Sequence, residues 1–338
     1  MAAYVGVGHA IGCNSGTDAL VLALRAAGVG HDDFVAVPAF TFSATAAAVE
    51  LVDAEIVFCD IREEDFGIDA SQLDKWKLNG VKAVIGVNMF GIPCDWDGIR
   101  KATEGQGVVL IEDAAQSMGA MYKGARSGSL ADIGCTSFYP SKPLSGIGDG
   151  GMVFTNDPIM AQDIRSISNH GRAIGLNKPY SAIRVGMNSR LDSIQAAVLI
   201  ERFKDFEIHE LPYRNRQASD YFYELEKCPS IYGQMGYKMP WSWYPLLYPN
   251  REERDEAFLE YGRGDLKWGE HGGARVIYPE PLHLMPAFKH YGHKRGDFPV
   301  SESVCDRILA FPINHHWEEN QCLRFLMSSA TSAATASR

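Results

Sequence analysis

Residues 108–120 read VVLIEDAAQSMGA, an unbroken apolar run that ends in two acids. A strand that is buried on both faces of a parallel sheet has this continuous apolar character, because neither face meets water. The run AVIGV at residues 83–87 is of the same kind. These two runs predict a mostly parallel sheet with helices on both faces.

The same alternation extends outward on both sides through the first two-thirds of the chain. Short β-branched runs are expected as strands at residues 35–37, 56–60, 83–87, 108–112, 136–139 and 152–155. Helical patterns lie at residues 18–27, 43–51, 70–76 and 96–103, and a longer one at 191–206. Strands that alternate with helices are typical of an α/β fold.

The composition changes after residue 206. Residues 232–299 are rich in Tyr, Trp, Gly and Pro, and turn signals occur throughout this segment. We therefore predict a large domain at residues 1–206 and a smaller C-terminal α+β domain at 207–327. The small, polar residues 328–338 are expected to form a frayed tail.

Charge and composition exclude several classes of function. The chain of 338 residues has a formal net charge of −10, which opposes binding to nucleic acid. No run of 18 apolar residues predicts a membrane span, and the N-terminus lacks the pattern of a signal peptide. The seven scattered cysteines form no Cys-x-x-Cys pair, so neither a disulfide framework nor a metal site is expected. A cytoplasmic protein is the prediction.

The stretch GCNSGTDALVLALRAAG places a small polar loop directly before a helix. Free N–H groups and the dipole at such a helix start favour an anion. Gly16 lets the backbone approach a ligand closely, and Thr17 adds a hydroxyl group. The alternative interpretation is an ordinary capped core helix.

The strand predicted at residues 108–112 ends in Glu112, and Asp113 follows directly. Ligands of α/β sheets bind beyond the carboxyl ends of the strands, where these two acids lie. A carboxylate at this position can hold a ring nitrogen protonated, and Gln116 can donate a hydrogen bond nearby. The alternative is an acid that stabilises a helix N-terminus.

The stretch GCTSFYPSKPLSGIGDGGMVFTN, residues 134–156, places Lys142 on a turn between two prolines. A lysine that is withdrawn from water has a lowered pKa and attacks carbonyl groups, whereas a solvated loop lysine does neither. Both interpretations remain open on this segment alone. Gly146, Gly148 and Gly151 match G-x-G-x-x-G, but the segment runs into a strand and not a helix, which argues against a dinucleotide site.

Taken together, these segments resemble the DegT/DnrJ/EryC1/StrS sugar aminotransferase family of fold type I. The resemblance spans residues 4–326 and includes VPAFTFSATAAAVELVDAEIVFCDI and VGMNSRLDSIQAAVL. It implies a large domain with a mostly parallel seven-stranded sheet between helices, and pyridoxal 5'-phosphate (PLP) as the cofactor.

The resemblance also implies roles for single residues. Lys142 would carry the cofactor as a Schiff base, Asp113 would pair with its ring nitrogen, and Phe42 would lie over its ring. The cofactor-binding residues that it implies are Gly16, Thr17, Phe42, Asp113, Gln116, Ser137, Lys142 and Asn188. Arg190, Tyr278 and His283 are candidate substrate contacts, although His283 is equally well explained as a structural loop residue. Asn188 and Arg190 would reach the active site of a neighbouring subunit, which implies a homodimer with shared sites.

The reaction implied is transamination with L-glutamate as donor, through pyridoxamine phosphate, to a nucleotide-linked keto sugar. Relatives with histidine in place of Lys142 are dehydratases, so the lysine favours amino transfer. The sequence is most similar to the subgroup that acts on UDP-linked 3-keto N-acetylhexosaminuronic acids in lipopolysaccharide and O-antigen synthesis. A 4-keto sugar, a lyase reaction and a non-catalytic binding role are the alternatives.

Overall fold

The computed structural model describes residues 1–73, 80–173, 181–225, 227, 229, 236–262 and 273–313. Its centre is a seven-stranded sheet in the order β1-β9-β8-β5-β4-β2-β3. The strands are β1 (His9–Cys13), β2 (Phe34–Pro38), β3 (Glu55–Cys59), β4 (Val81–Val87), β5 (Val109–Asp113), β8 (Ile133–Ser137) and β9 (Gly151–Thr155). Neighbours from β3 to β8 pair in parallel, and β9 is antiparallel to both β8 and β1. The predicted mostly parallel seven-stranded α/β sheet is confirmed.

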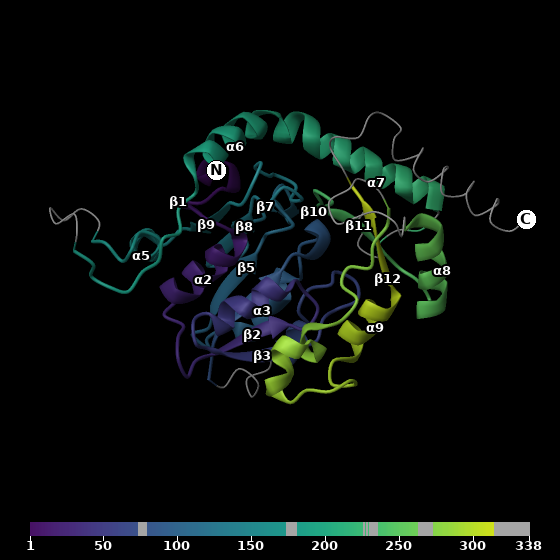
Figure 1. The fold of residues 1–338 in the computed structure, drawn as a ribbon, viewed down its shortest axis with the longest axis horizontal. Helices are drawn as coiled ribbons and strands as arrows, with labels where there is room; N and C mark the ends of the chain where they lie inside the picture. The colour runs from purple at the N-terminus through teal and green to yellow at the C-terminus, as the bar shows by residue number, and fades with distance from the viewer. Residues whose placement is uncertain are drawn as a thin grey trace, which may run out of the picture.

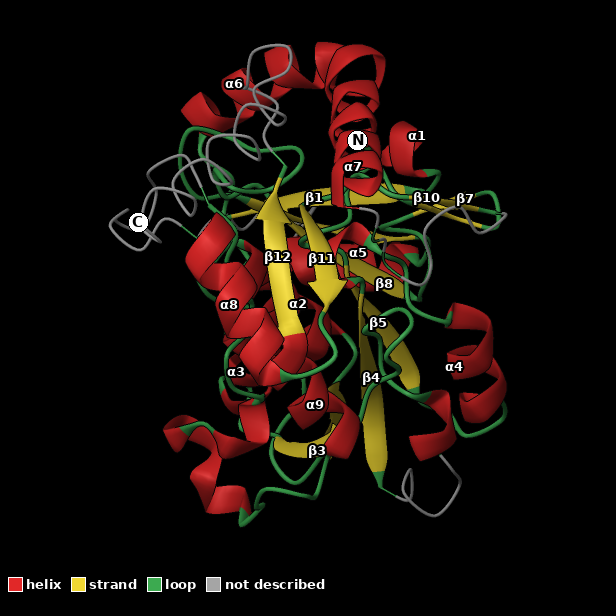
Figure 2. Cartoon of the chain, turned by 90° about the vertical axis from the view of Figure 1, so that its right-hand side faces the viewer, coloured by secondary structure: helices red, strands yellow, loops and turns green. Residues whose placement is uncertain are grey.

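Helices cover both faces of this sheet (Figure 2). On one face lie α2 (Gly16–Ala26), α3 (Ser43–Glu50) and α5 (Pro158–Ile167), and on the other lies α4 (Trp96–Thr103). Successive strand residues point to opposite faces, so Val35 and Val37 join the core beneath α2 while Ala36 joins the cluster that contains Trp96. This two-sided burial explains why the strands are apolar throughout.

A long helical rod runs from α6 (Ser193–Asp205) through a π-helical turn, η3 (Phe206–Glu210), into α7 (Leu211–Leu225). It arches over the upper edge of the molecule in Figure 1. The short α1 (Ala2–Val5) packs beneath it, with the rings of Tyr4 and Phe203 5.0 Å apart. The predicted domain boundary near residue 206 therefore falls inside a continuous helix and not in a linker.

The C-terminal part combines helices with a two-stranded sheet. Strands β11 (Trp243–Leu247) and β12 (Ile308–Pro312) pair antiparallel, and α8 (Arg251–Tyr261) and α9 (Pro299–Arg307) pack nearby. The shorter elements of the described residues are η1 (Ala70–Gln72), η2 (Met89–Gly91), β6 (Met121–Tyr122), β7 (Ala125–Arg126), β10 (Tyr237–Lys238), η4 (Leu282–Leu284) and η5 (Pro286–Tyr291).

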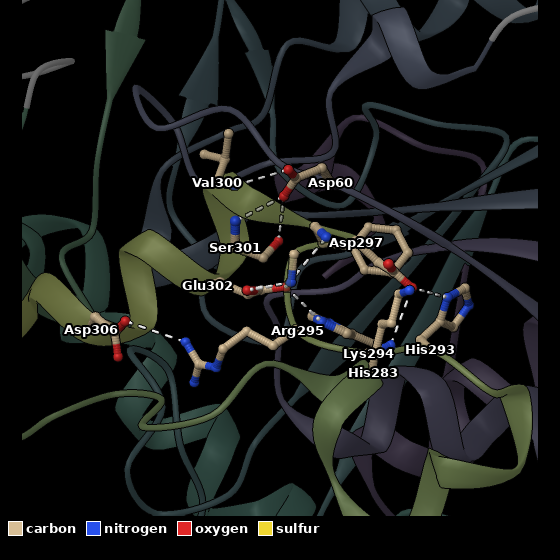
Figure 3. Close-up of polar contacts among 12 residues, drawn as sticks. Asp60, His283, His293, Lys294, Arg295, Asp297, Val300, Ser301, Glu302 and Asp306 are labelled. Atoms are coloured by element: carbon tan, nitrogen blue, oxygen red, sulfur yellow. Dashed lines mark hydrogen bonds and ion pairs between the residues drawn. The ribbon is translucent and has the colours of Figure 1, made fainter.

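Asp60, which follows β3, fastens this C-terminal part to the large sheet (Figure 3). Its carboxylate accepts hydrogen bonds from the backbone N–H groups of Val300 (2.9 Å) and Ser301 (2.8 Å) and from the Ser301 hydroxyl (2.7 Å). These donors lie in the first turn of α9, where backbone N–H groups have no partner within the helix. One buried acid thus caps a helix that is about 240 residues distant in sequence.

Two details differ from the sequence predictions. The strand predicted at residues 136–139 is β8, which begins three residues earlier and ends at Ser137. The helix predicted at residues 70–76 is only the 3-10 turn η1 where it is described, and residues 74–79 lie outside the described residues. The predicted tail, 328–338, also lies outside them.

Among the described residues, no helix is long and apolar enough to span a membrane.

Candidate active site

The carboxyl ends of several strands meet at one edge of the large sheet. Parallel β5 and β8 end there at Asp113 and Ser137. Strand β1 has the same direction, because β9 is antiparallel to both β1 and β8, so the loop from β1 into α2 reaches this edge as well. A Cβ atom at Gly16 would lie only 2.7 Å from the Cβ atom of Ser137. The structure therefore brings these three predicted residues to one edge.

The start of α2 presents free hydrogen-bond donors beside Ser137. The Ser15 hydroxyl caps the helix by accepting from the N–H group of Asp18 at 3.0 Å. Among the described residues, no acceptor meets the N–H groups of Gly16 and Thr17. Two free N–H groups at the positive end of a helix, next to a serine hydroxyl, form a suitable cradle for a phosphate group. This arrangement fits the anion expected from the sequence.

Asp113 is buried at the end of β5, with 6% of its surface exposed. One carboxylate oxygen accepts from the Thr45 hydroxyl at 2.8 Å, and the other accepts from the N–H group of Ala115 at 3.1 Å. Burial raises the pKa of this acid, while the two hydrogen bonds and the charge of Lys142 act in the opposite direction. A cation in the site, such as a protonated ring nitrogen, would stabilise the carboxylate further.

Lys142 lies on a tight turn that α6 holds in place. The Lys142 N–H group donates to the Tyr139 carbonyl at 2.9 Å, and Arg202 of α6 donates to the Ser145 carbonyl at 2.7 Å. Burial lowers the pKa of the Lys142 amine, and the charge of Asp113 partly opposes this shift. Lys142 as a whole is half-buried, and its amine lies on the enclosed side, within electrostatic reach of Asp113, as the sequence predicts for a nucleophilic lysine.

Gln116 and Tyr278 enclose another side of the site. The Gln116 carbonyl oxygen accepts from the N–H group of Phe90 (2.9 Å) and from the Ser242 hydroxyl (3.2 Å). Its amide nitrogen then points to the Tyr278 hydroxyl at 3.4 Å. The ring of Phe42, which is 53% exposed, lies 6.0 Å from that of Tyr278. Burial, with a contribution from the charge of Asp113, raises the pKa of Tyr278, which places the tyrosine near the acid.

Asn188 and Arg190 are exposed on either side of the buried Ser189. The Ser189 hydroxyl donates to Asp18 of α2 at 2.7 Å and so fixes this segment beside the helix start. Arg190 donates to the Asn188 side chain at 3.0 Å, and both side chains face outward. The predicted contacts of Asn188 with the cofactor and of Arg190 with the substrate remain predictions.

The predicted substrate contact by His283 requires correction. Its side chain is buried, its Nε2 atom pairs with Glu302 at 3.1 Å, and its ring packs against Phe298 with 4.6 Å between centroids (Figure 3). The Nδ1 atom of this ring has no hydrogen-bond partner among the described residues, but the side chain is fully buried, so neither nitrogen reaches the surface. The interpretation of His283 as a structural loop histidine is the one that the structure supports.

Two buried polar residues near the site, Thr45 and Asn88, were not predicted from the sequence. The structural role of Glu112 was not predicted either. Glu112 accepts from Asn88 (2.7 Å), Ser127 (2.6 Å) and the N–H groups of Gly128 and Leu130 (both 2.9 Å). Adjacent residues of a strand point to opposite faces, so only Asp113 of the acidic pair faces Lys142. That alternation was the available signal in the sequence.

This geometry can be compared with known proteins. Residues 1–326 match the DegT/DnrJ/EryC1/StrS aminotransferase family. The chain belongs to this family. The chain is therefore a PLP-dependent aminotransferase, and the expected cofactor and reaction class are confirmed. The site fits PLP, because a phosphate cradle, an acid for the ring nitrogen and a buried amine meet at one edge of the sheet.

Two solved structures and two curated relatives illustrate the similarity. A DegT DnrJ EryC1 StrS aminotransferase from Brucella abortus is 36% identical, with 98% of this chain and 87% of that chain covered and a TM-score of 0.85. DesV of S. venezuelae, solved with a ketimine intermediate, is 33% identical, with 98% and 86% covered and a TM-score of 0.86. The UDP-2-acetamido-2-deoxy-3-oxo-D-glucuronate aminotransferase of Pseudomonas aeruginosa is 35% identical (98% of this chain, 88% of that protein). The UDP-N-acetyl-3-dehydro-alpha-D-glucosamine aminotransferase of Acidithiobacillus ferrooxidans is 34% identical (96% and 84%).

Proposed function

We propose that this aminotransferase moves an amino group from L-glutamate to C3 of a UDP-linked 3-keto sugar, a 2-acetamido-3-keto-hexuronate, for lipopolysaccharide or a related amino-sugar polymer. The observation that carries the amino-transfer chemistry is the arrangement at one edge of the sheet, where the turn with Lys142 follows β8 beside the buried Asp113 at the end of β5 and the free start of α2. The names of the relatives from P. aeruginosa and A. ferrooxidans, both 3-keto UDP-sugar enzymes, support the choice of sugar.

The chain's own residues divide the work of the reaction. PLP supplies an aldehyde that condenses with amines and a ring that withdraws an electron pair. The N–H groups of Gly16 and Thr17 and the Ser137 hydroxyl bind the phosphate group. Asp113 keeps the ring nitrogen protonated. The Lys142 Nζ atom, lowered in pKa and therefore able to lose its proton, would take the proton from Cα of glutamate in the half-reaction that leaves the amino group on the cofactor. It would deliver a proton to C3 of the sugar in the half-reaction that passes the amino group on.

We also propose a homodimer with shared active sites. Val185 is 85% exposed and Ile194 is 67% exposed, and these side chains flank Asn188 and Arg190. Ile183 and Ile200, on the same segment and on α6, are exposed as well. Exposed apolar side chains that gather in the chain next to candidate site residues are typical of a subunit interface.

Mixing two inactive variants tests the shared site. Arg190→Ala carries an intact Lys142, and Lys142→Ala carries an intact Arg190. If the sites are shared, a mixed dimer contains one complete site, and activity returns on mixing. If no activity returns although sedimentation confirms mixed dimers, the two residues serve the same subunit and the proposal fails.

A panel of substrates tests the proposed sugar. The holoenzyme is incubated with glutamate and with UDP- and dTDP-linked 3-keto and 4-keto sugars, and 2-oxoglutarate release is measured. The proposal predicts the highest kcat/KM for the UDP-linked 3-keto uronate. Preference for a 4-keto sugar would refute the keto position, and elimination of water without 2-oxoglutarate would indicate lyase chemistry. Lys142→Ala is the control that should abolish every turnover.

A further inference from the structure

We propose that Thr45 is a positioning residue that holds Asp113 in its ionised form, and that Thr41 fixes the direction of the Thr45 hydroxyl. The proposal concerns the acid of the reaction and does not depend on which sugar is the substrate. The two threonines lie at the start of α3: Thr41 precedes the helix, and Thr45 is the third residue of the helix.

The proton positions in this chain of contacts follow from chemistry. The Thr45 Oγ1 atom lies 2.8 Å from the Asp113 Oδ2 atom, and a carboxylate can only accept, so Thr45 donates. The Thr41 and Thr45 hydroxyl oxygens are 3.1 Å apart. Because the single proton of the Thr45 hydroxyl is committed to Asp113, Thr41 must donate in this second contact. The result is a directed relay from Thr41 through Thr45 to Asp113.

Burial gives this relay its effect. Thr41, Thr45 and Asp113 are all buried, so water cannot replace the lost hydroxyl. Burial raises the pKa of Asp113, and the Thr45 hydrogen bond is the largest of the contributions that lower it. A protonated Asp113 could no longer keep a ring nitrogen charged. The hydrogen bond that the Thr45 hydroxyl donates to the carboxylate therefore keeps Asp113 ionised, and so functional, near neutral pH.

The pKa of Asp113 in the cofactor-free protein provides the test. Carbon-13-labelled aspartate is followed by NMR as a function of pH, and Asp113→Asn assigns the signal. Thr45→Val removes the hydroxyl and keeps the shape of the side chain. We expect the pKa of Asp113 to rise by about one to two pH units, which corresponds to one charge-assisted hydrogen bond. Thr45→Ser, which keeps the hydroxyl, should restore the wild-type value.

Two further variants complete the design. Thr41→Val should raise the pKa by a smaller amount, about half a unit or less, because Thr45 still donates to Asp113. Thr136→Val is the matched control, since buried Thr136 donates to the Ala114 carbonyl at 3.1 Å and not to the acid. It should leave the pKa of Asp113 unchanged. Thr45→Ala is a second variant without the hydroxyl, in case the valine variant does not fold.

A purely structural role of Thr45 would give a different result. Thr45→Val or Thr45→Ala would then lower the melting temperature while the pKa of Asp113 stayed at the wild-type value, and this outcome overturns the proposal. In the holoenzyme, the acid limb of the kcat profile should move to higher pH in Thr45→Val and return in Thr45→Ser. An unmoved acid limb would equally contradict the assigned role.

Discussion

Asp60 provides a quantitative test of how the C-terminal part is attached to the large sheet. In Asp60→Ala, the N–H groups of Ile61, Val300 and Ser301 and the Ser301 hydroxyl lose their acceptor. Each buried donor left unsatisfied costs about 1–3 kcal/mol, and loss of a capping acid alone costs about 0.5–2 kcal/mol. Because such contributions are not additive, we expect the free energy of unfolding to fall by about 3–5 kcal/mol.

Asp60→Asn should cost less than Asp60→Ala. The Oδ1 atom accepts from the N–H groups of Ile61 and Ser301 and from the Ser301 hydroxyl, whereas only the Val300 N–H group uses Oδ2. An asparagine can retain the first oxygen and lose the second, so about 1–2 kcal/mol is expected. The order wild type, Asn, Ala in decreasing stability is therefore part of the prediction.

Asp69 provides the matched control. It makes the same two kinds of contact, with the N–H group (2.9 Å) and the hydroxyl (2.7 Å) of Ser71, but at the surface. Water replaces exposed contacts, so Asp69→Ala should cost about 0.5 kcal/mol. Urea unfolding of the variants gives the comparison. If Asp60→Ala is no more destabilising than Asp69→Ala, the reasoning about the α9 cap is refuted.

Three further predictions concern the active site. Asp113→Asn should keep the fold and reduce kcat by about 100- to 1,000-fold, because the ring nitrogen loses its charge partner. Stopped-flow kinetics measures kcat, and an unchanged value would rule out the role assigned to Asp113. Gly16→Ala places a Cβ atom 2.7 Å from that of Ser137 and should weaken PLP binding about tenfold or more, measured by equilibrium dialysis; unaltered affinity would contradict the phosphate cradle. In the cofactor-free protein, the lowered pKa means that Lys142 is neutral at a lower pH than an ordinary lysine, so its modification by a carbonyl reagent should begin at lower pH than that of a free lysine derivative. The same pH dependence for Lys142, followed in peptide mass spectra, and for the free derivative would refute this.

The strands and most helices of the large domain follow from local patterns. Apolar runs such as residues 108–112 fix both the strand and its burial on two faces, so β5 needed no tertiary information. Strand β1 was missed because HAIGC is short and contains glycine, and it becomes a strand only by pairing with β9. The change of composition after residue 206 does not coincide with a break in secondary structure, because α6, η3 and α7 form one continuous helical rod through that residue.

The candidate site was predictable where chemistry required particular residue types. Asp113 ends β5 and Lys142 lies on the turn that follows β8, so their meeting follows from the parallel arrangement of these two strands. The partners of Asp113 were not predictable, since nothing in the sequence indicates that Thr45 faces β5 and not solvent. For His283 the sequence left a substrate contact and a structural role open, because nothing in it indicates that this histidine pairs with Glu302.

The central claim is that the buried amine of Lys142 binds the PLP aldehyde covalently. Holoenzyme is reduced with borohydride and digested, and the peptides are analysed by mass spectrometry, with Lys142→Ala as the control. The account predicts a single pyridoxyl adduct on the peptide that contains Lys142, and none in the control. An adduct on a different lysine, or full activity in Lys142→Ala, would contradict it.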